Sequence, residues 1–130
     1  MILLDTHVAV WMTSDKRQLS TAAAEAIREE SRAGRGVAVA SSTLWEIAMM
    51  SARNELRLPG TLTDYLSYVE SVFVVLPITG AIAERSILFA GVFPNDPTDR
   101  LIGATAVVHG IKLVTKDKKI RKSNQVDCVW

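Results

Sequence analysis

The residues best placed to do chemistry are four acids that stand where short apolar runs give way to turns or helical segments: Asp5, Glu46, Asp99 and Asp117. Asp5 directly follows the run "ILL", and Asp117 comes two positions after the run "IKLVT". Glu46 lies about two turns into the helical segment that follows "GVAVA", and Asp99 lies in the first turn of its own segment. In an open α/β sheet, ligands bind just beyond the carboxyl ends of the strands. If the sheet forms as expected, several of these acids lie near the same edge.

Acids that gather at one edge need a counter-charge. At an effective dielectric constant of ~20, two like charges about 4 Å apart repel by about 4 kcal/mol, and each raises the pKa of its neighbour. Carboxylates and water suit Mg²⁺ or Mn²⁺, and such an ion neutralises the cluster. A metal-bound water loses its proton more readily and can attack phosphorus. The pattern therefore favours metal-assisted hydrolysis of a phosphodiester bond.

Each acid also has an ordinary alternative role. In "NDPTDRLIGATAV" (95–107), Asp96 suits an N-cap, Pro97 the first helical position, and Asp99 the third, where the helix dipole favours it. Asp5 and Asp117 are also the kind of acid found in turns. Glu46, in "LWEIAMM", can alternatively point outward to solvent between its apolar neighbours without a role in catalysis. Taken singly, the capping explanation of Asp99 ranks above catalysis, and the other three acids decide the matter.

The rest of the sequence predicts one α/β domain over residues 1–130. Strands are expected at 2–4, 36–40, 72–76, 111–115 and 126–130, and helices at 20–33, 41–54, 61–72, 79–92 and 97–109. Strands that alternate with helices indicate a mostly parallel sheet covered on both faces.

Composition narrows the class further. The chain of 130 residues is 48% hydrophobic and 22% charged with a net charge of +1, so any nucleic-acid contact depends on local patches and a metal. One cysteine, Cys128, excludes an intrachain disulfide and a thiolate metal cluster. The start "MILLDTH" lacks the basic region of a signal peptide, and the longest apolar stretch is too short to span a bilayer. We expect a soluble, cytoplasmic protein without a membrane partner.

Four motifs carry a family resemblance: "LLDTHV", "LWEIAMM", "DPTDRLIGATAV" and "LVTKD". In this order, over almost the whole chain, they resemble the acidic motifs of PIN domains, in particular the VapC-type ribonuclease toxins of bacterial toxin–antitoxin pairs. The resemblance implies a PIN-like three-layer α/β/α fold and a Mg²⁺- or Mn²⁺-dependent endoribonuclease. It assigns catalysis and metal binding to Asp5, Glu46, Asp99 and Asp117, the last being the most variable in the family. It also implies a cognate VapB-type antitoxin in the active-site groove and a homodimer.

Residues near these motifs are candidates for supporting roles. The basic residues expected to contact the RNA backbone are Arg100, Lys116, Lys118 and Lys119, although such a charged run is most often a solvated loop. The residues expected to support the acids or hold water are Thr6, Ser42 and Asp96. His7 and His109 are interpreted as structural. The large apolar residues Trp11, Trp45, Met49 and Met50 are assigned mostly to the core, with some of them open to an apolar antitoxin segment.

Three other functions are weaker. A phosphotransferase of the haloacid dehalogenase type needs a second Asp two residues after Asp5, where this chain has His7. A receiver-like signalling domain needs an acid pair at the first strand and an Asp after a later one, and "FVVLPIT" contains no acid. A catalytically silent PIN fold that only binds RNA or protein is the main alternative, and the presence of all four acids argues against it.

Overall fold

A computed structural model describes residues 1–130, in which strands and helices alternate along the chain. The strands are β1 (Ile2–Leu4), β2 (Val37–Ala40), β3 (Val74–Leu76), β4 (Lys112–Val114) and β5 (Cys128–Val129). The α-helices are α1 (Thr6–Ser14), α2 (Thr21–Arg32), α3 (Ser41–Ala52), α4 (Leu62–Val72), α5 (Gly80–Ile87), α6 (Pro97–His109) and α7 (Lys118–Ser123), and a short 3₁₀ turn covers Lys16–Gln18. None of the helices is both long and apolar enough to cross a membrane.

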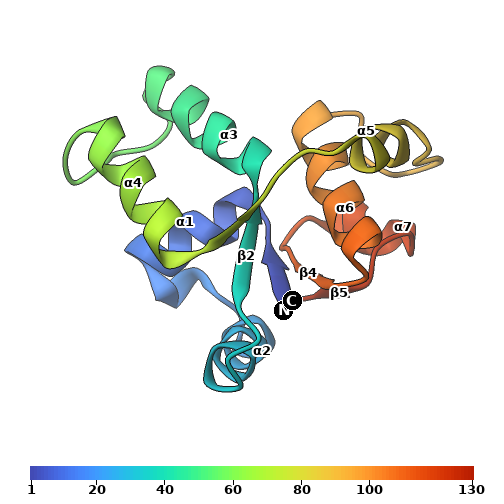
Figure 1. Cartoon of the computed structure of the whole chain (residues 1–130), viewed down its shortest axis with the longest axis horizontal. Helices are drawn as coiled ribbons and strands as arrows, with labels where there is room; N and C mark the ends of the chain where they lie inside the picture. Colours follow the sequence, from blue (N-terminus) through green and yellow to red (C-terminus); the bar gives the residue numbers. More distant parts are fainter.

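The five strands form one sheet in the order β3-β2-β1-β4-β5, and every neighbouring pair is parallel (Figure 1). The predicted α/β fold with a mostly parallel sheet is thus confirmed. Strands added after β1 first extend the sheet on one side, through β2 and β3, and then on the other, through β4 and β5. The order therefore reverses between β1 and β4, which is where ligands bind in open α/β sheets.

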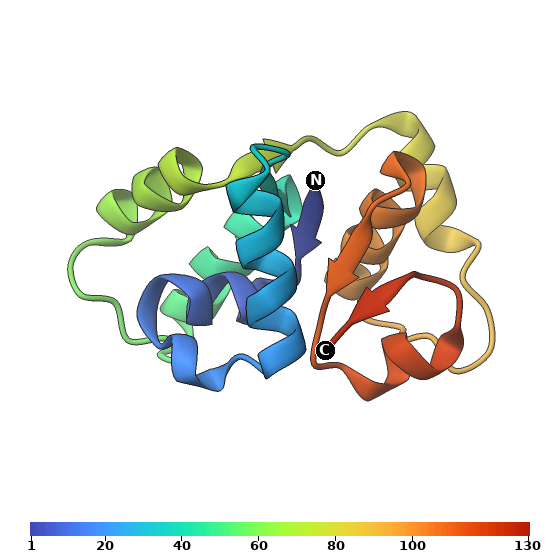
Figure 2. The same cartoon turned by 90° about the horizontal axis from the view of Figure 1, so that it is seen from below.

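Helices cover both faces of the sheet. Helices α1 to α4 lie on one side of β1 and α5 to α7 on the other (Figure 2). Strands β1 and β2 are apolar throughout because both of their faces are largely buried. Leu4 and Val39 pack with α1–α4, whereas Leu3 and, from β4, Leu113 pack with α5–α7. The carboxyl ends of the strands remain free of these two layers and carry the site.

Two helices were not expected from the sequence. Helix α1 consists largely of residues with modest helix propensity, such as valine, threonine and tryptophan. It forms because Asp5 caps it and because Val8, Ala9 and Val10 are buried against the sheet. Helix α7 is short and basic, and Asp117 caps it. Strand β3 begins at Val74 and not at 72, because α4 extends through Val72.

The loop between α5 and α6 is pressed onto α6 at Gly103. The rings of Phe89 and Phe93 stack with centroids 3.8 Å apart. A Cβ at position 103 would lie 2.8 Å from the Phe93 ring, so only glycine allows this approach. The packing fixes the path of the chain that leads to Asp96 and the start of α6.

Candidate active site

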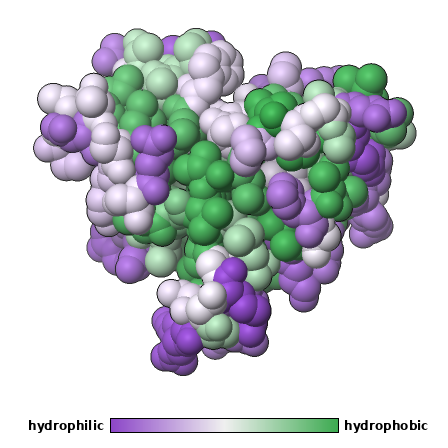
Figure 3. All heavy atoms as spheres, in the orientation of Figure 1, coloured by the Kyte–Doolittle hydropathy of each residue, from purple (hydrophilic) through white to green (hydrophobic).

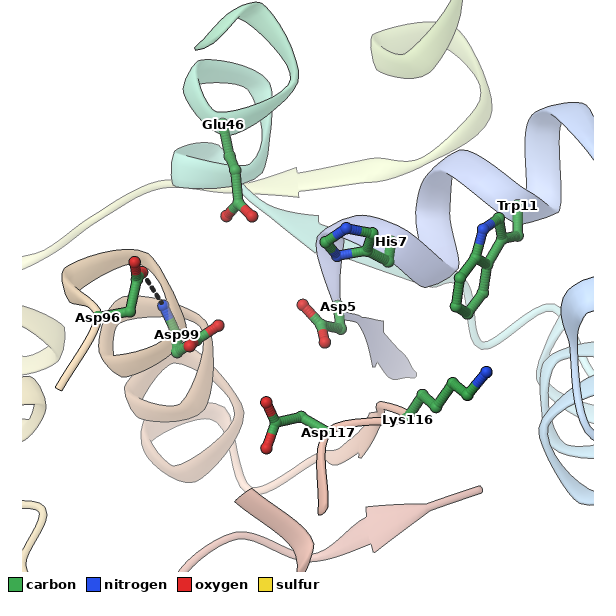
Figure 4. Close-up of a pocket in the computed structure, with 8 residues that line it drawn as sticks. All are labelled: Asp5, His7, Trp11, Glu46, Asp96, Asp99, Lys116 and Asp117. Carbon is green, nitrogen blue, oxygen red and sulfur yellow. Dashed lines mark hydrogen bonds between the residues drawn. The ribbon is translucent and has the colours of Figure 1, made fainter. Parts of the chain in front are cut away.

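A pocket of about 420 Å³ opens at the carboxyl ends of the strands (Figure 4). Five acids line it: Asp5, Glu46, Asp96, Asp99 and Asp117; the other lining residues are His7, Trp11 and Lys116. The carboxylates of Asp5, Glu46, Asp99 and Asp117 point toward a common space from four different segments of the chain. The structure thus brings the four sequence-predicted acids together at the point where the strand order reverses.

Asp5 is the most buried of these acids, with 8% of its surface exposed. Its Oδ1 accepts a hydrogen bond from the Thr6 backbone N–H at 2.7 Å, and its Oδ2 accepts one from the Thr115 hydroxyl at 2.7 Å. The oxygen of that hydroxyl also accepts a hydrogen bond from the Asp117 N–H at 3.1 Å. Thr115 therefore joins two of the acids. Sequence analysis missed it, although its place between β4 and Asp117 was a usable signal.

Glu46 comes from the second turn of α3 and is held by Thr6. The Thr6 hydroxyl lies 3.2 Å from Glu46 Oε2 and 3.2 Å from the Thr43 hydroxyl. Because the Thr6 backbone also binds Asp5, Thr6 connects the acid of β1 with the acid of α3. This geometry agrees with the supporting role that the sequence suggested for Thr6.

Asp96 and Asp99 divide the two roles that the sequence left open. Asp96 is the N-cap of α6, and its Oδ1 accepts hydrogen bonds from the N–H groups of Thr98 at 2.9 Å and Asp99 at 3.3 Å. Pro97 occupies the first turn, as predicted. The Asp99 carboxylate accepts no hydrogen bond from the protein and points into the pocket. Capping thus accounts for Asp96 and leaves Asp99 free.

Asp117 caps α7 and faces the pocket with its second oxygen. Its Oδ1 accepts hydrogen bonds from the N–H groups of Lys119 at 2.7 Å and Ile120 at 2.9 Å. Oδ2 has no hydrogen-bond partner in the protein. Asp117 can therefore cap α7 with Oδ1 and bind a ligand with Oδ2.

Negative charge dominates the pocket, because the acids that line it outnumber the basic residues. Burial, followed by the charges of Asp5, Asp96, Glu46 and Asp117, raises the pKa of Asp99 to about 7. Burial and the charge of Asp5 also raise the pKa of Glu46. The pKa of Asp5 is raised by burial, which outweighs the hydrogen bonds from Thr115 and Thr6. A bound cation would offset the repulsion among these carboxylates and favour the charged forms of Asp5, Glu46 and Asp99.

The donor set fits a hard divalent cation. Asp99 has two carboxylate oxygens without a protein partner, and Glu46 and Asp117 have one each. No three His, Cys, Asp or Glu side chains form a ready-made metal cluster. Mg²⁺ is usually held by one or two carboxylates and keeps several waters, so acids spaced around a pocket suit it better than they suit a metal that requires a closed ligand shell.

The expected basic contacts separate into three groups. Lys116 lines the pocket, and Lys118 and Lys119 are exposed in the first turn of α7 outside it. The guanidinium of Arg100 does not line the pocket. It donates to the backbone carbonyls of Pro94 at 2.9 Å, Ser86 at 3.1 Å and Phe89 at 3.2 Å. Arg100 thus anchors the segment before α6, and its expected contact with RNA stays a prediction.

Other expectations also change. The hydroxyl of Ser42 is buried without a partner and does not line the pocket. His7 was interpreted as structural, yet it is exposed and lines the pocket. Trp45 was assigned mostly to the core, but it is 59% exposed. It lines a neighbouring groove of about 220 Å³ together with Met49, Met50 and Arg53.

Comparison with known proteins decides the family. The model of the PIN domain family matches residues 2–124. The chain belongs to the PIN domain family. It is 35% identical over 120 residues to Ribonuclease VapC22 of Mycobacterium tuberculosis, an alignment that covers 92% of this chain and 89% of that protein. Both findings agree with the family resemblance of the four acidic motifs.

Solved structures share this PIN fold. The DNA-bound VapBC of Salmonella typhimurium contains a chain that superposes with a TM-score of 0.72 at 17% identity, covering 98% of this chain and 97% of that one. VapBC2 of Rickettsia felis, bound to a DNA fragment from the promoter, gives a TM-score of 0.70 at 14% identity with the same coverages. At these identities the match establishes the three-layer architecture of the PIN domain.

Proposed function

We propose that this PIN domain is a metal-dependent endoribonuclease that acts as the cytoplasmic toxin of a toxin–antitoxin pair. The observation that carries the proposal is the convergence of Asp5, Glu46, Asp99 and Asp117 on one pocket. The similarity to Ribonuclease VapC22 supports RNA as the substrate.

Asp5, Glu46, Asp99 and Asp117 would hold Mg²⁺ or Mn²⁺. Such a cation supplies Lewis-acid stabilisation of the phosphoryl group and acidifies water for attack on phosphorus. The protein supplies the orientation of the acids. Thr6 and Thr115 fix the two oxygens of Asp5, and the helix caps at Asp96 and Asp117 fix the starts of α6 and α7. These supports keep the carboxylates directed into the pocket in spite of their mutual repulsion.

Lys116 provides a positive charge at the rim of the pocket. It is exposed, lines the pocket and makes no ion pair with any of the five carboxylates. A phosphate entering the pocket would meet this ammonium group. Lys118 and Lys119 extend the positive charge along α7 and would contact phosphates farther along the strand.

The test is cleavage of a mixed pool of unstructured RNA by the purified chain, with Mg²⁺, with Mn²⁺, and with EDTA as the control. We expect cleavage in either metal and none in EDTA. Asp99→Asn should lower the rate at least about a hundredfold, because the removal of a transition-state charge contact typically costs this much. Binding of RNA without cleavage in both metals would instead support the silent PIN fold.

Asp64→Asn is the matched control. Asp64 occupies the third position of α4, as Asp99 does in α6, and its N–H is likewise bound by the side chain of its N-cap. Asp64 is exposed and far from the pocket lining. Its substitution should leave the cleavage rate unchanged. Equal losses in the two variants would assign the effect to the helices and not to the site.

The proposed antitoxin partner has a suitable surface beside the pocket. The groove lined by Trp45, Met49, Met50 and Arg53 shares His7, Glu46 and Asp96 with the acidic pocket. A VapB-type segment laid in this groove would cover the acids, with methionines adapting to its apolar side chains. Co-expression with the cognate antitoxin should suppress toxicity, and Trp45→Glu should reduce that suppression without loss of the toxin's fold.

We also propose a homodimer. Figure 3 shows hydrophobic side chains gathered over the middle of the face where the chain passes from α4 through β3 to α5. Val72 at the end of α4, Val74 in the edge strand β3 and Ile78 just after it are each more than 40% exposed. Two-fold pairing would cover the same side chains on both copies. Light scattering should give a dimer for the wild type and a monomer for Val74→Lys.

A further inference from the structure

One wall of the acidic pocket is not acidic. It consists of His7, Trp11 and Lys116, on the side opposite Asp99 (Figure 4). The indole of Trp11 lies with its centroid 6.0 Å from the His7 ring and 5.9 Å from the ring of Trp130. The Lys116 ammonium lies 5.6 Å from the Trp11 centroid. The Trp11 indole in this wall has no part in holding a cation, because an indole is neither a metal ligand nor a proton carrier at neutral pH.

Core packing alone does not account for the position of Trp11, which lies against the edge of the core and also lines the pocket. The buried side of α1 is made by Val8, Ala9 and Val10, whereas Trp11 is only partly buried and lines the pocket. Contacts with Trp130 and with the edge of the core hold the indole in place. The result is a supported aromatic surface beside a cluster of carboxylates.

The Lys116 side chain covers the face of the Trp11 ring and can move away from it. Lys116 is exposed, has a flexible side chain and makes no ion pair. Its ammonium group would move to a phosphate when one enters the pocket, because charge pairing with a phosphate is stronger than its contact with the ring. The indole would then be open to a flat ligand group of its own size.

We infer that Trp11 stacks on an unpaired RNA base next to the scissile phosphate, so that the enzyme selects single-stranded RNA and binds purines better than pyrimidines at that position. The inference rests on the proposed nuclease function and adds the substrate class. Base stacking on aromatic side chains is the usual means by which proteins hold splayed-out bases, and its strength follows the size of the base. A paired base is not available to the indole.

The experiment measures equilibrium binding by fluorescence anisotropy, with the Asp99→Asn chain in Mg²⁺ and short labelled oligoadenylate or oligouridylate. Trp11→Leu keeps apolar bulk and loses the stacking surface, and we expect it to weaken oligoadenylate binding about tenfold. It should also abolish the preference for adenine over uracil. Trp11→Phe keeps a ring and should restore most of the affinity. Tyr68→Ala, which removes an exposed aromatic of α4 outside the pocket, should have no effect.

The outcomes separate this inference from the proposed function. Equal affinities of Trp11→Leu and its parent, or an unchanged base preference, would overturn the stacking role even if the wild type cleaves RNA. Loss of the preference in Trp11→Leu would support it even if the wild type fails to cleave. Should Trp11→Leu not fold, an abasic nucleotide in the oligoadenylate replaces the variant. The parent must then lose affinity for at least one abasic position, and no loss at any position would overturn the inference.

Discussion

The two edges of the same sheet treat carboxylates in opposite ways. At the amino edge, Glu30 lies 2.7 Å from the amino group of Met1 and 2.9 Å from the Arg35 guanidinium. Hydrogen bonds from Arg35 and the terminal amine lower the pKa of Glu30 to about 2. At the carboxyl edge, burial and neighbouring carboxylates raise the pKa of Asp99 to about 7.

The opposite pKa shifts indicate that the amino edge stabilises the fold and that the carboxyl edge binds a ligand. At the amino edge, Glu30 meets opposite charges from the protein itself, those of Met1 and Arg35. The carboxyl edge leaves five acids around one pocket, with Lys116 turned to Trp11. Repulsion among these carboxylates destabilises the fold, and a bound cation would convert it into attraction. Single substitutions at either edge test whether the two edges differ in this way.

Among the residues that support the acids, the largest effect is expected at Thr115, which joins Asp5 to Asp117. Thr115→Val removes the hydroxyl but keeps the shape, so Asp5 Oδ2 loses its donor at 2.7 Å. We predict a 10- to 100-fold loss of RNA cleavage, roughly the effect of removing a hydrogen bond behind a metal ligand. Thr105→Val is the control, because this buried hydroxyl donates to the Leu101 carbonyl and lies outside the pocket. Similar cleavage rates in the two variants would deny Thr115 a role in positioning.

A second prediction concerns stability without metal. Since the folded-state pKa of Asp99 is raised from 3.8 to about 7, folding is penalised as pH rises from about 4 to 7, where the unfolded chain loses this proton and the folded chain keeps it. Asp99→Asn should therefore be more stable than the wild type above pH 7, on the order of 1–2 kcal/mol, because water partly screens this half-buried carboxyl. The gain should vanish near pH 4. Denaturant unfolding in EDTA at both pH values tests this, and a loss of stability at pH 8 would show that Asp99 is structural.

The amino edge gives the smallest effect and the opposite sign. Glu30→Gln removes the partner of both Met1 and Arg35, so we predict a modest fall in Tm at pH 7. Because the pKa of Glu30 is lowered from 4.5 to about 2, this contribution is present above pH 4.5 and is lost as pH falls toward 2. Glu29→Gln is the control, since Glu29 is 78% exposed and its contact with Arg35 is 3.6 Å. A rise in Tm for Glu30→Gln would remove the contrast between the edges.

Sequence reasoning could find the parallel sheet and the four acids because both depend on local signals. Apolar strand runs followed by acids specify which edge receives the carboxylates. The helix cap at Asp96 was predictable from "NDPTD" alone. Helix α1 was not, because tertiary burial of its valines overrides a weak propensity.

The supporting residues were harder to find because their roles depend on contacts across the fold. Thr115 lies 110 positions from Asp5 in the chain, and its place between β4 and Asp117 does not by itself reveal the hydrogen bond to Asp5. Arg100 stands next to Asp99, yet its side chain turns toward the end of α5 and the loop that follows it. In the sequence, Trp11 cannot be distinguished from a core residue, and only the folded structure shows that it lines the pocket.

Whether the carboxyl edge binds a metal through Asp99 can be measured by calorimetry with Mn²⁺ near pH 7, with the wild type, Asp99→Asn and the Asp64→Asn control. Ligand carboxylates bind metal only after they lose their protons, so the raised pKa of Asp99 makes proton release accompany binding. We predict saturable binding with proton release for the wild type and Asp64→Asn, and affinity at least about tenfold lower, with less proton release, for Asp99→Asn. Equal Mn²⁺ affinity in all three chains would contradict the account.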